Sequence, residues 1–340
     1  MPLIGEETHE RLLAMFVDAL GAVGPYMTDD GITDIMVNAD GKVWVQGHTG
    51  GQVDSGLRIK SAQAEQIIRL VANSVGAVCH AQEPDLSAEL PGSGARFQAW
   101  VPPVSDAPAF VIRKHAIAIF TLDDYVARGI CTSRQAAWMR EAIQQAANMA
   151  IVGGMRTGKT TLLNALLYEM VALGIRVLTI EDTRELQCSV PNRIALYSKK
   201  GLRTMQDHVR SALRSNADRI ILGEVRGPEF LDVLDSWNTG HPGGICTVHA
   251  NGCREALTRM EGFVRRGNVP REVARDLLVE AGPVLVHLQA PPTGRVVRSM
   301  ARVVGLAEGD YVLEEKGGAS AEDGKLEDTT TERKDEIWHG

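Results

Sequence analysis

The fold is decided by one stretch of the sequence, Gly153-Gly154-Met155-Arg156-Thr157-Gly158-Lys159-Thr160. It matches the P-loop pattern, in which a glycine and four further residues precede Gly-Lys-Ser/Thr. A short apolar run at residues 150–152 leads into the loop, and a predicted helix at residues 161–173 follows it and ends at Gly174. A chance glycine-rich turn would lack this strand and this helix. The sequence therefore predicts a nucleotide-binding domain.

The residue types of the loop suit ATP bound together with Mg²⁺. Glycines let backbone N–H groups close around phosphate oxygens, and the N-terminus of the following helix adds a favourable potential. Lys159 is expected to reach the β- and γ-phosphates, the Thr160 hydroxyl to coordinate Mg²⁺, and Thr161 to reach the α-phosphate. The predicted nucleotide-binding residues are Gly153, Gly154, Met155, Arg156, Thr157, Gly158, Lys159, Thr160 and Thr161.

Two acidic residues follow apolar runs further along the chain. Glu181 follows the run at residues 177–180, and Glu224 follows the run at residues 220–222. The carboxyl ends of parallel strands face the crevice in which ligands bind. An NTPase needs one carboxylate that holds Mg²⁺ through water and one that orients the attacking water. We assign Glu224 first to the water, with Glu181 as the alternative and as the candidate metal residue beside Thr160. A lone acid in a loop would more often be merely solvated.

A histidine ends a further apolar run. His249 follows residues 245–248, and the glycine-rich segment 239–244 precedes that run. A histidine in this place can contact the γ-phosphate and report its loss, while the glycines allow the loop to move. The alternative is a structural histidine whose hydrogen bonds are satisfied by its own surroundings.

The C-terminal part of the chain alternates apolar runs with helical segments. Short, β-branched runs separated by helices are typical of a parallel sheet that is buried on both faces. The runs lie at residues 149–152, 177–180, 220–222 and 245–248. A helix at residues 270–281 and strands at 284–288 and 300–304 are expected to follow. The sequence predicts the α/β class for this part.

The N-terminal part mixes helices with strands that are joined by turns, which indicates a smaller α+β domain. The predicted helices lie at residues 8–20 and 61–75, and the predicted strands at 32–37, 42–45, 96–101 and 109–113. Asp40-Gly41 is a hairpin signal between the first two strands. We place an N-terminal domain at 1–118, a linker with a short helix at 119–132, the nucleotide-binding domain at 133–315 and a polar, disordered tail at 316–340.

Composition limits the partners and the compartment. The chain has 340 residues, a formal net charge of -7 and 5% aromatic residues, which makes it a poor match for nucleic acid. The widely spaced cysteines, the absence of a signal peptide and the lack of a bilayer-spanning apolar run predict a cytoplasmic protein. One group of arginines is interpreted as phosphate-binding or inter-subunit ion pairing rather than as a nucleic-acid stripe. It consists of Arg203, Arg210, Arg214, Arg219 and Arg226.

Taken in order, these motifs resemble the traffic (secretion) ATPase superfamily. The P-loop resembles its Walker A box, residues 179–186 (TIEDTREL) its Asp box, residues 222–229 (LGEVRGPE) its Walker B box, and residues 239–251 its His box. The Walker B form is similar to the conjugal transfer and type IV secretion branch, and residues 32–38 and 90–93 are similar to its TrbB-type ATPases. Arg156 departs from the family loop, which usually carries a small residue there.

The resemblance implies a RecA-like P-loop NTPase domain that follows the smaller N-terminal domain in the chain. It also implies a motor that hydrolyses ATP to power conjugal transfer or type IV secretion, including pilus assembly and substrate translocation. It also implies a homo-hexameric ring that docks on inner-membrane secretion-channel proteins, peripheral at the cytoplasmic side. We expect no direct sequence-specific binding of nucleic acid. The alternatives are a nucleic-acid motor of the RecA or helicase type and a regulatory module that hydrolyses little. Intact Glu181, Glu224 and His249 count against the last of these.

The resemblance further implies a catalytic role for the N-terminal domain. Transition-state charge on the γ-phosphate requires cations beyond Lys159 and Mg²⁺, and arginine is their usual source. Arg96 and Arg113 lie on predicted strands, and the matching arginines of the family face the phosphates across the domain cleft. Substitution of Arg113 is expected to matter more than that of Arg96. The alternative is that both form salt bridges on the strand face.

Overall fold

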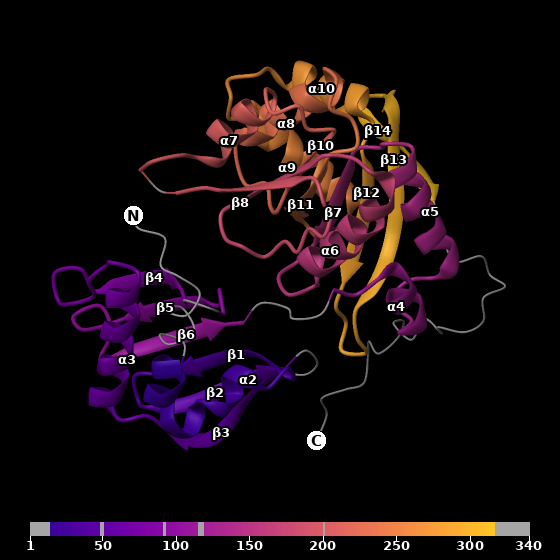
Figure 1. Cartoon of the computed structure of the whole chain (residues 1–340). Coiled ribbons are helices and arrows are strands. Elements are labelled where there is room, and N and C mark those ends of the chain that lie inside the picture. The colour runs from indigo at the N-terminus through magenta and orange to yellow at the C-terminus, as the bar shows by residue number, and fades with distance from the viewer. Residues whose placement is uncertain (1–13, 48–50, 91–92, 115–118, 200, 317–340) are drawn as a thin grey trace, which may run out of the picture.

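The computed structural model describes residues 14–47, 51–90, 93–114, 119–199 and 201–316. Their strands form one sheet in the N-terminal part of the chain and a second sheet in the C-terminal part, and the two parts lie side by side (Figure 1). Each sheet packs against its own helices and has its own buried side chains. The candidate site lies where the two parts face each other.

The N-terminal sheet is antiparallel, with the strand order β3-β2-β1-β6-β5-β4. Its strands are β1 (Ile32–Val37), β2 (Lys42–Gly47), β3 (Gln52–Arg58), β4 (Asp85–Glu89), β5 (Arg96–Trp100) and β6 (Ala109–Arg113). The predicted β1–β2 hairpin is confirmed, and it turns at Gly41, whose φ of 79° a glycine adopts without steric cost. Helix α3 (Ser61–Ser74) buries Ile67, Ile68 and Val71 in the core of this part, and η1 (Gly21–Val23) and α2 (Pro25–Thr28) precede β1.

The C-terminal sheet has the strand order β14-β13-β12-β7-β11-β10-β8-β9. Its strands are β7 (Met149–Gly153), β8 (Val177–Glu181), β9 (Arg193–Tyr197), β10 (Arg219–Leu222), β11 (Ile245–His249), β12 (Val284–Gln289), β13 (Val296–Ala307) and β14 (Asp310–Lys316). Neighbours from β12 to β9 are parallel, whereas β13 and β14 are antiparallel additions. The four predicted runs form β7, β11, β10 and β8 at the centre of the sheet, which confirms the predicted α/β class.

Helices cover both faces of this sheet (Figure 1). They are α4 (Leu122–Ala127), α5 (Ser133–Gln144), α6 (Lys159–Glu169), η2 (Met170–Leu173), α7 (Met205–Ala212), α8 (Glu229–Asn238), α9 (Cys253–Arg265) and α10 (Arg271–Ala281). Along β7, Met149 and Ile151 pack with α4, α5 and α6, whereas Ala150 and Val152 pack with α7 to α10. Alternate residues of one strand thus bury opposite faces, which explains why the central strands are apolar throughout.

Residues 119–132, predicted as a linker, pack against the C-terminal sheet. Leu122 and Tyr125 of α4 are buried in the same cluster as Met149, and the Ile130 carbonyl accepts a hydrogen bond from the Val297 N–H. At the other end of the chain, β14 runs through Lys316, one residue into the predicted tail. The rest of that tail and residues 8–13 of the first predicted helix lie outside the described residues.

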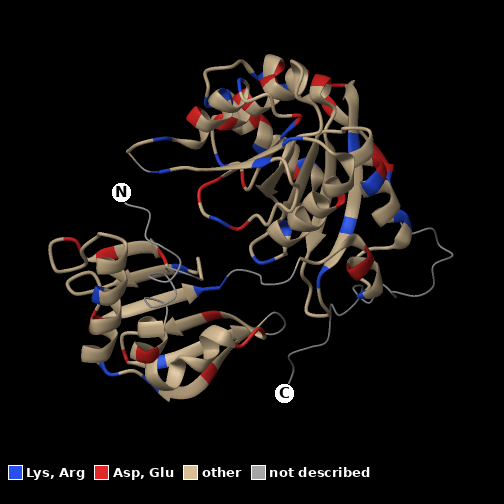
Figure 2. Cartoon of the chain, viewed as in Figure 1, with Lys and Arg blue, Asp and Glu red and all other residues tan. Residues whose placement is uncertain are grey.

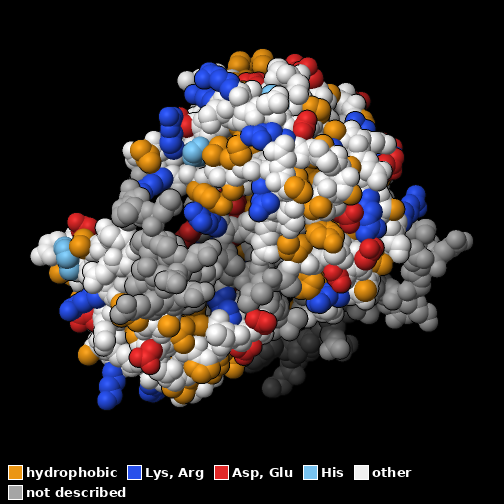
Figure 3. Space-filling model, in the orientation of Figure 1, with side chains coloured by type: hydrophobic (Ala, Val, Ile, Leu, Met, Phe, Trp, Pro, Cys, Tyr) orange, Lys and Arg blue, Asp and Glu red, His pale blue; other side chains and the backbone are white. Residues whose placement is uncertain are grey.

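Acidic and basic side chains are interspersed over both parts (Figures 2 and 3). Of the grouped arginines, Arg210 pairs with Asp232 and Arg226 pairs with Glu224, while buried Arg219 donates to the Ile143 carbonyl at the end of α5. None of the described helices is both long and apolar enough to cross a bilayer.

Candidate active site between the two sheets

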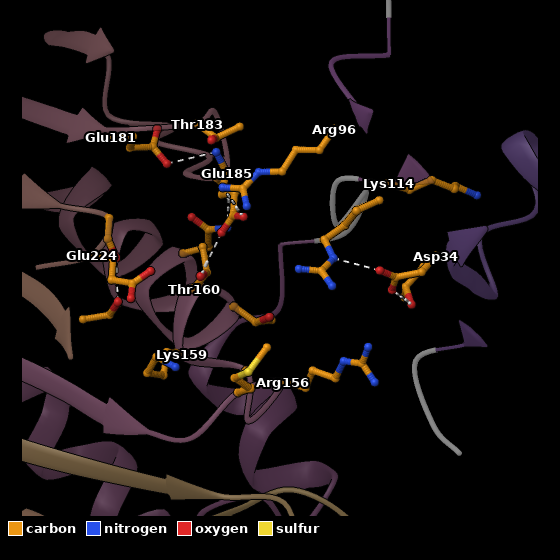
Figure 4. Close-up of a pocket in the computed structure, with 18 of the residues that line it drawn as sticks. Asp34, Arg96, Lys114, Arg156, Lys159, Thr160, Glu181, Thr183, Glu185 and Glu224 are labelled. Carbon is orange, nitrogen blue, oxygen red and sulfur yellow. Dashed lines mark hydrogen bonds and ion pairs between the residues drawn. The ribbon is translucent and has the colours of Figure 1, made fainter. Parts of the chain in front are cut away.

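A cleft of about 410 Å³ separates the N-terminal sheet from the P-loop (Figure 4). Its C-terminal wall includes Met155, Arg156, Gly158, Lys159, Thr160 and Thr161 of the predicted loop, together with Glu181, Glu224 and His249. Its N-terminal wall includes Asp34, Arg96, Arg113 and Lys114. Most predicted site residues therefore line one cavity, which the chain assembles from segments far apart in the sequence.

The P-loop bends where its glycines allow it. Gly158 has a φ of 93°, and helix α6 begins at the next residue. A Cβ on Gly153 would lie 2.4 Å from Thr157 Oγ1 and 2.8 Å from the Leu288 carbonyl oxygen, so only glycine fits there. Thr157 Oγ1 in turn donates to the Gly154 carbonyl. Arg156, the residue that departs from the family pattern, also has a positive φ, of 62°, so the loop holds a non-glycine residue in the left-handed region.

Lys159 connects the loop with the end of β11. Its Nζ donates to the carbonyl oxygens of Gly153, at 3.1 Å, and Gly154, at 2.8 Å, and lies 3.2 Å from Nδ1 of His249. Because the ammonium group can only donate, His249 Nδ1 is the acceptor and the imidazole proton resides on Nε2. Burial lowers the pKa of Lys159 to about 8, while the negative charge of Glu224 opposes the shift.

Glu224 contacts the other ring nitrogen of His249. Its Oε1 lies 3.2 Å from His249 Nε2, and its Oε2 accepts a hydrogen bond of 2.6 Å from Arg226 Nη2. Burial alone would raise the pKa of Glu224, but the hydrogen bond and charge of Arg226 outweigh it and hold the pKa below the ordinary value. Burial and the neighbouring Lys159 lower the pKa of His249, so the imidazole is neutral at neutral pH. Glu224 is thus an ionised carboxylate linked through a neutral histidine to the P-loop lysine.

Glu181 has a different environment. It is 2% exposed, and its Oε1 accepts the backbone N–H groups of Glu185 and Leu186, whereas its Oε2 is buried without a partner among the described residues. Burial raises the pKa of Glu181 to about 7, even though those two hydrogen bonds lower it. A Cβ on Gly223 would lie 3.1 Å from Glu181 Cγ, so the glycine before Glu224 leaves room for this side chain.

Glu185 is a site residue to which the sequence pattern assigned no role. One of its oxygens, Oε2, accepts the Thr160 hydroxyl at 3.1 Å, and the other, Oε1, lies 2.7 Å from Arg96 Nη2 of β5 (Figure 4). It therefore joins the P-loop to the N-terminal sheet. Its place four residues after Glu181 in the Asp box could have marked it as a site residue. Its role, however, depends on Arg96, which belongs to the other domain.

The two N-terminal arginines differ in their contacts. Arg96 and Arg113 are paired neighbours on β5 and β6, and both line the cleft. Arg96 reaches Glu185, and its Nε is buried without a partner among the described residues. Arg113 Nε instead pairs with Asp34 of β1 at 2.8 Å, which is the strand-face salt bridge considered as the alternative. In the described structure Arg96 thus contacts a residue of the other domain and Arg113 a residue of its own sheet, and the larger effect expected for Arg113 stays a prediction.

The cleft fits a magnesium nucleotide. Glu181 Oε2 and Arg96 Nε are a buried acceptor and a buried donor that still lack partners among the described residues, beside the N-terminus of α6. No cluster of three His, Cys, Asp or Glu side chains suited to a metal ion occurs in the described ranges. Proteins usually bind Mg²⁺ through one or two side chains, waters and the phosphates themselves. Thr160 with the carboxylates of Glu185 and Glu181 would hold it.

Residues 27–281 match the model of a family described as "Type II/IV secretion system protein". The chain is 36% identical over 310 residues to a probable conjugal transfer protein TrbB of Sinorhizobium fredii, which covers 90% of this chain and 94% of that one. It is 26% identical over 322 residues to the type IV secretion system protein VirB11 of Bartonella henselae, covering 82% and 90%. The X-ray structure of the Legionella pneumophila ATPase DotB is similar in fold, with a TM-score of 0.58 and 18% identity over 91% of this chain and 83% of that one.

Proposed function

The chain belongs to the type II/IV secretion system protein family. We propose that it is the ATPase motor of a conjugal transfer or type IV secretion machine and that it acts on Mg-ATP bound between its two domains. The relatives named for conjugal transfer and type IV secretion match over most of their own lengths, which supports this branch of the family. No feature of the described residues favours the alternative of a motor that acts directly on nucleic acid.

The loop and its neighbours bind the phosphates in this proposal. Backbone N–H groups at the start of α6 face the anion, and Lys159 turns from the Gly153 and Gly154 carbonyls to the β- and γ-phosphates. Bound Mg²⁺ would neutralise charge that develops on the phosphate oxygens. His249 loses the proton donor at its Nδ1 when Lys159 turns to the phosphates, so its hydrogen bonding registers whether they are present.

Water activation falls to Glu224. Its carboxylate is ionised, lies in the cleft and is oriented from one side by His249 and from the other by Arg226. An ionised, fixed carboxylate can orient a water for in-line attack on the γ-phosphate and accept its proton. Burial raises the pKa of Glu181 to about 7 and so favours its protonated form, which makes it the weaker candidate for that role.

The proposal also covers how copies of the chain assemble and where they are located. We expect a homo-hexameric ring docked on inner-membrane channel proteins from the cytoplasmic side, on the strength of family membership. The interspersed surface charges and the net charge of -7 support a partner other than nucleic acid.

The observation that carries the proposal is the convergence of Lys159, His249 and Glu224 on one cleft behind the P-loop. The test is phosphate release from ATP by the wild type, Lys159→Ala and the control Lys199→Ala, whose side chain does not line the cleft. Lys159→Ala is expected to lose turnover while keeping its fold, because the substitution removes the P-loop charge that binds the β- and γ-phosphates. Wild-type turnover in Lys159→Ala would remove the P-loop assignment.

A further inference from the structure

One carboxylate in the cleft contacts both domains. Glu185 accepts the Thr160 hydroxyl with Oε2 and pairs with Arg96 through Oε1. We propose that Glu185 is the positioning residue that couples closure of the N-terminal domain to the metal-binding hydroxyl of Thr160. This inference rests on the proposed function and assigns it a means of communication between the domains.

The geometry at Thr160 defines the first half of the coupling. The hydroxyl donates its only proton to Glu185, so its lone pairs are left for a cation on the other side. A carboxylate in this position fixes the rotamer of the hydroxyl and is placed to accept hydrogen bonds from water bound to Mg²⁺. Loss of that carboxylate therefore weakens metal binding without removing the hydroxyl itself.

The geometry at Arg96 defines the second half. Arg96 Nη2 binds the Glu185 oxygen that Thr160 does not use, while Arg96 Nε has no partner among the described residues. Glu185 thus anchors one nitrogen of the guanidinium and leaves another donor beside the cleft. When the N-terminal domain approaches, Arg96 arrives at a site that already holds Thr160 in its metal-binding orientation, because the same carboxylate orients both.

Three other acids of the cleft make different contacts in the described structure. Glu224 contacts His249 and Arg226 of its own domain, and Asp34 contacts Arg113 of its own sheet. Glu181 accepts backbone N–H groups of the segment that carries Glu185, which holds that segment in place. The contact between the domains at the metal-binding hydroxyl therefore passes through Glu185.

A neighbouring ion pair supplies a matched control. Arg184, the residue before Glu185, lies 3.6 Å from Glu89 of β4 through its Nε, and Glu89 is the cross-strand partner of Arg96. This pair also joins the two domains, but neither side chain lines the cleft or contacts Thr160. Glu89→Gln therefore removes a similar charge from the same interface without touching the proposed coupling.

The experiment uses the full chain as wild type, Glu185→Gln, Glu89→Gln, Arg96→Ala and the double variant Glu185→Gln/Arg96→Ala. Binding of fluorescent ADP is titrated with Mg²⁺ and repeated in EDTA, and ATP turnover is measured for each protein. Glu185→Gln is expected to raise the Mg²⁺ concentration for half-maximal binding about tenfold, as loss of a residue that orients a metal ligand does. Binding in EDTA is expected to stay near the wild-type level, and Glu89→Gln is expected to keep the wild-type Mg²⁺ requirement.

Turnover tests the coupling. Arg96→Ala is expected to lower kcat about tenfold in the wild type and to have little further effect in Glu185→Gln, because the two residues act as a unit. The inference is overturned if Glu185→Gln and Glu89→Gln share one Mg²⁺ requirement, or if the effects of Arg96→Ala and Glu185→Gln on kcat simply multiply. Wild type that neither binds nucleotide nor releases phosphate would instead refute the proposed function, so the two failures are distinguishable.

Discussion

At the scale of single residues, the two central carboxylates of the cleft occupy opposite electrostatic environments. Arg226 and its hydrogen bond keep Glu224 ionised, whereas burial favours the protonated form of Glu181. Sites that run acid and base chemistry often separate two titrating groups in this way. The environments thus favour Glu224 for the water, which is the order that the sequence suggested from strand-end position alone.

This assignment predicts the effect of two isosteric substitutions. Glu224→Gln is expected to bind Mg-ATP and to hydrolyse it at least about tenfold more slowly, because the amide cannot accept the proton of the attacking water. Single-turnover phosphate release and nucleotide binding measured on the same samples check it. If Glu181→Gln slows the chemical step far more than Glu224→Gln does, the roles of the two carboxylates are exchanged.

The pKa of Glu181 has a consequence for stability. Burial raises it to about 7 from an ordinary value of 4.5, so between these pH values the folded state binds more protons than the unfolded state. The free energy of unfolding therefore falls as pH rises through this window, by up to about 3 kcal/mol, and the loss is complete above it. Glu181→Gln does not titrate. Its Tm relative to wild type, measured in EDTA, is expected to be higher at about pH 8 than at about pH 5, and parallel curves for the two proteins would contradict this.

At the scale of elements, the central strands could be predicted because burial on both faces requires an apolar, β-branched run. Strands at sheet edges escaped prediction for the opposite reason. The side chains of β9 and β3 are largely exposed. Asp54 and Arg58 interrupt any apolar pattern in β3, and β9 is a short run behind Arg193. Pairing with a neighbour, β8 in one case and β2 in the other, defines them as strands.

Contacts between elements explain what the motifs could not reveal about the site. The P-loop, Glu181, Glu224 and His249 were predictable because each lies at the end of its own strand or in its own loop. Glu185 was not, because its role depends on Arg96 from the other sheet. The Asp34–Arg113 pair was equally hidden, since cross-strand register decides which charge faces which.

Helices α9 and α10 and strand β14 are joined by one buried acid. Glu261 is 4% exposed and accepts hydrogen bonds from Arg271 Nε at 2.6 Å and Arg275 Nε at 2.9 Å. Arg275 in turn donates to the Gly309 carbonyl before β14. Glu261→Gln is expected to reduce the free energy of unfolding by about 2 kcal/mol, since it weakens two charge-assisted hydrogen bonds. Denaturant unfolding checks this, with Glu272→Gln on the exposed side of α10 as control, and equal midpoints for the two variants would contradict it.

At the scale of the whole molecule, each part buries its own core. The cluster of the N-terminal sheet runs from Phe16 to Ile112, and the clusters of the C-terminal sheet begin at Leu122. Two ion pairs of the described residues join the parts, Arg96 with Glu185 and Glu89 with Arg184. Polar contacts that open and close at modest energetic cost suit a motor whose N-terminal domain moves over the nucleotide.

If both domains complete one ATPase site, removal of the N-terminal domain slows ATP turnover. The intact chain is compared with a fragment that starts at Thr121, which keeps the capping box of α4 and the buried residues of the C-terminal sheet. Circular dichroism and binding of fluorescent ADP verify that the fragment is folded and holds nucleotide. The fragment is expected to bind nucleotide but to hydrolyse ATP at least about tenfold more slowly than the intact chain, because it lacks Arg96 and Arg113. Turnover by the fragment at the rate of the intact chain would contradict it.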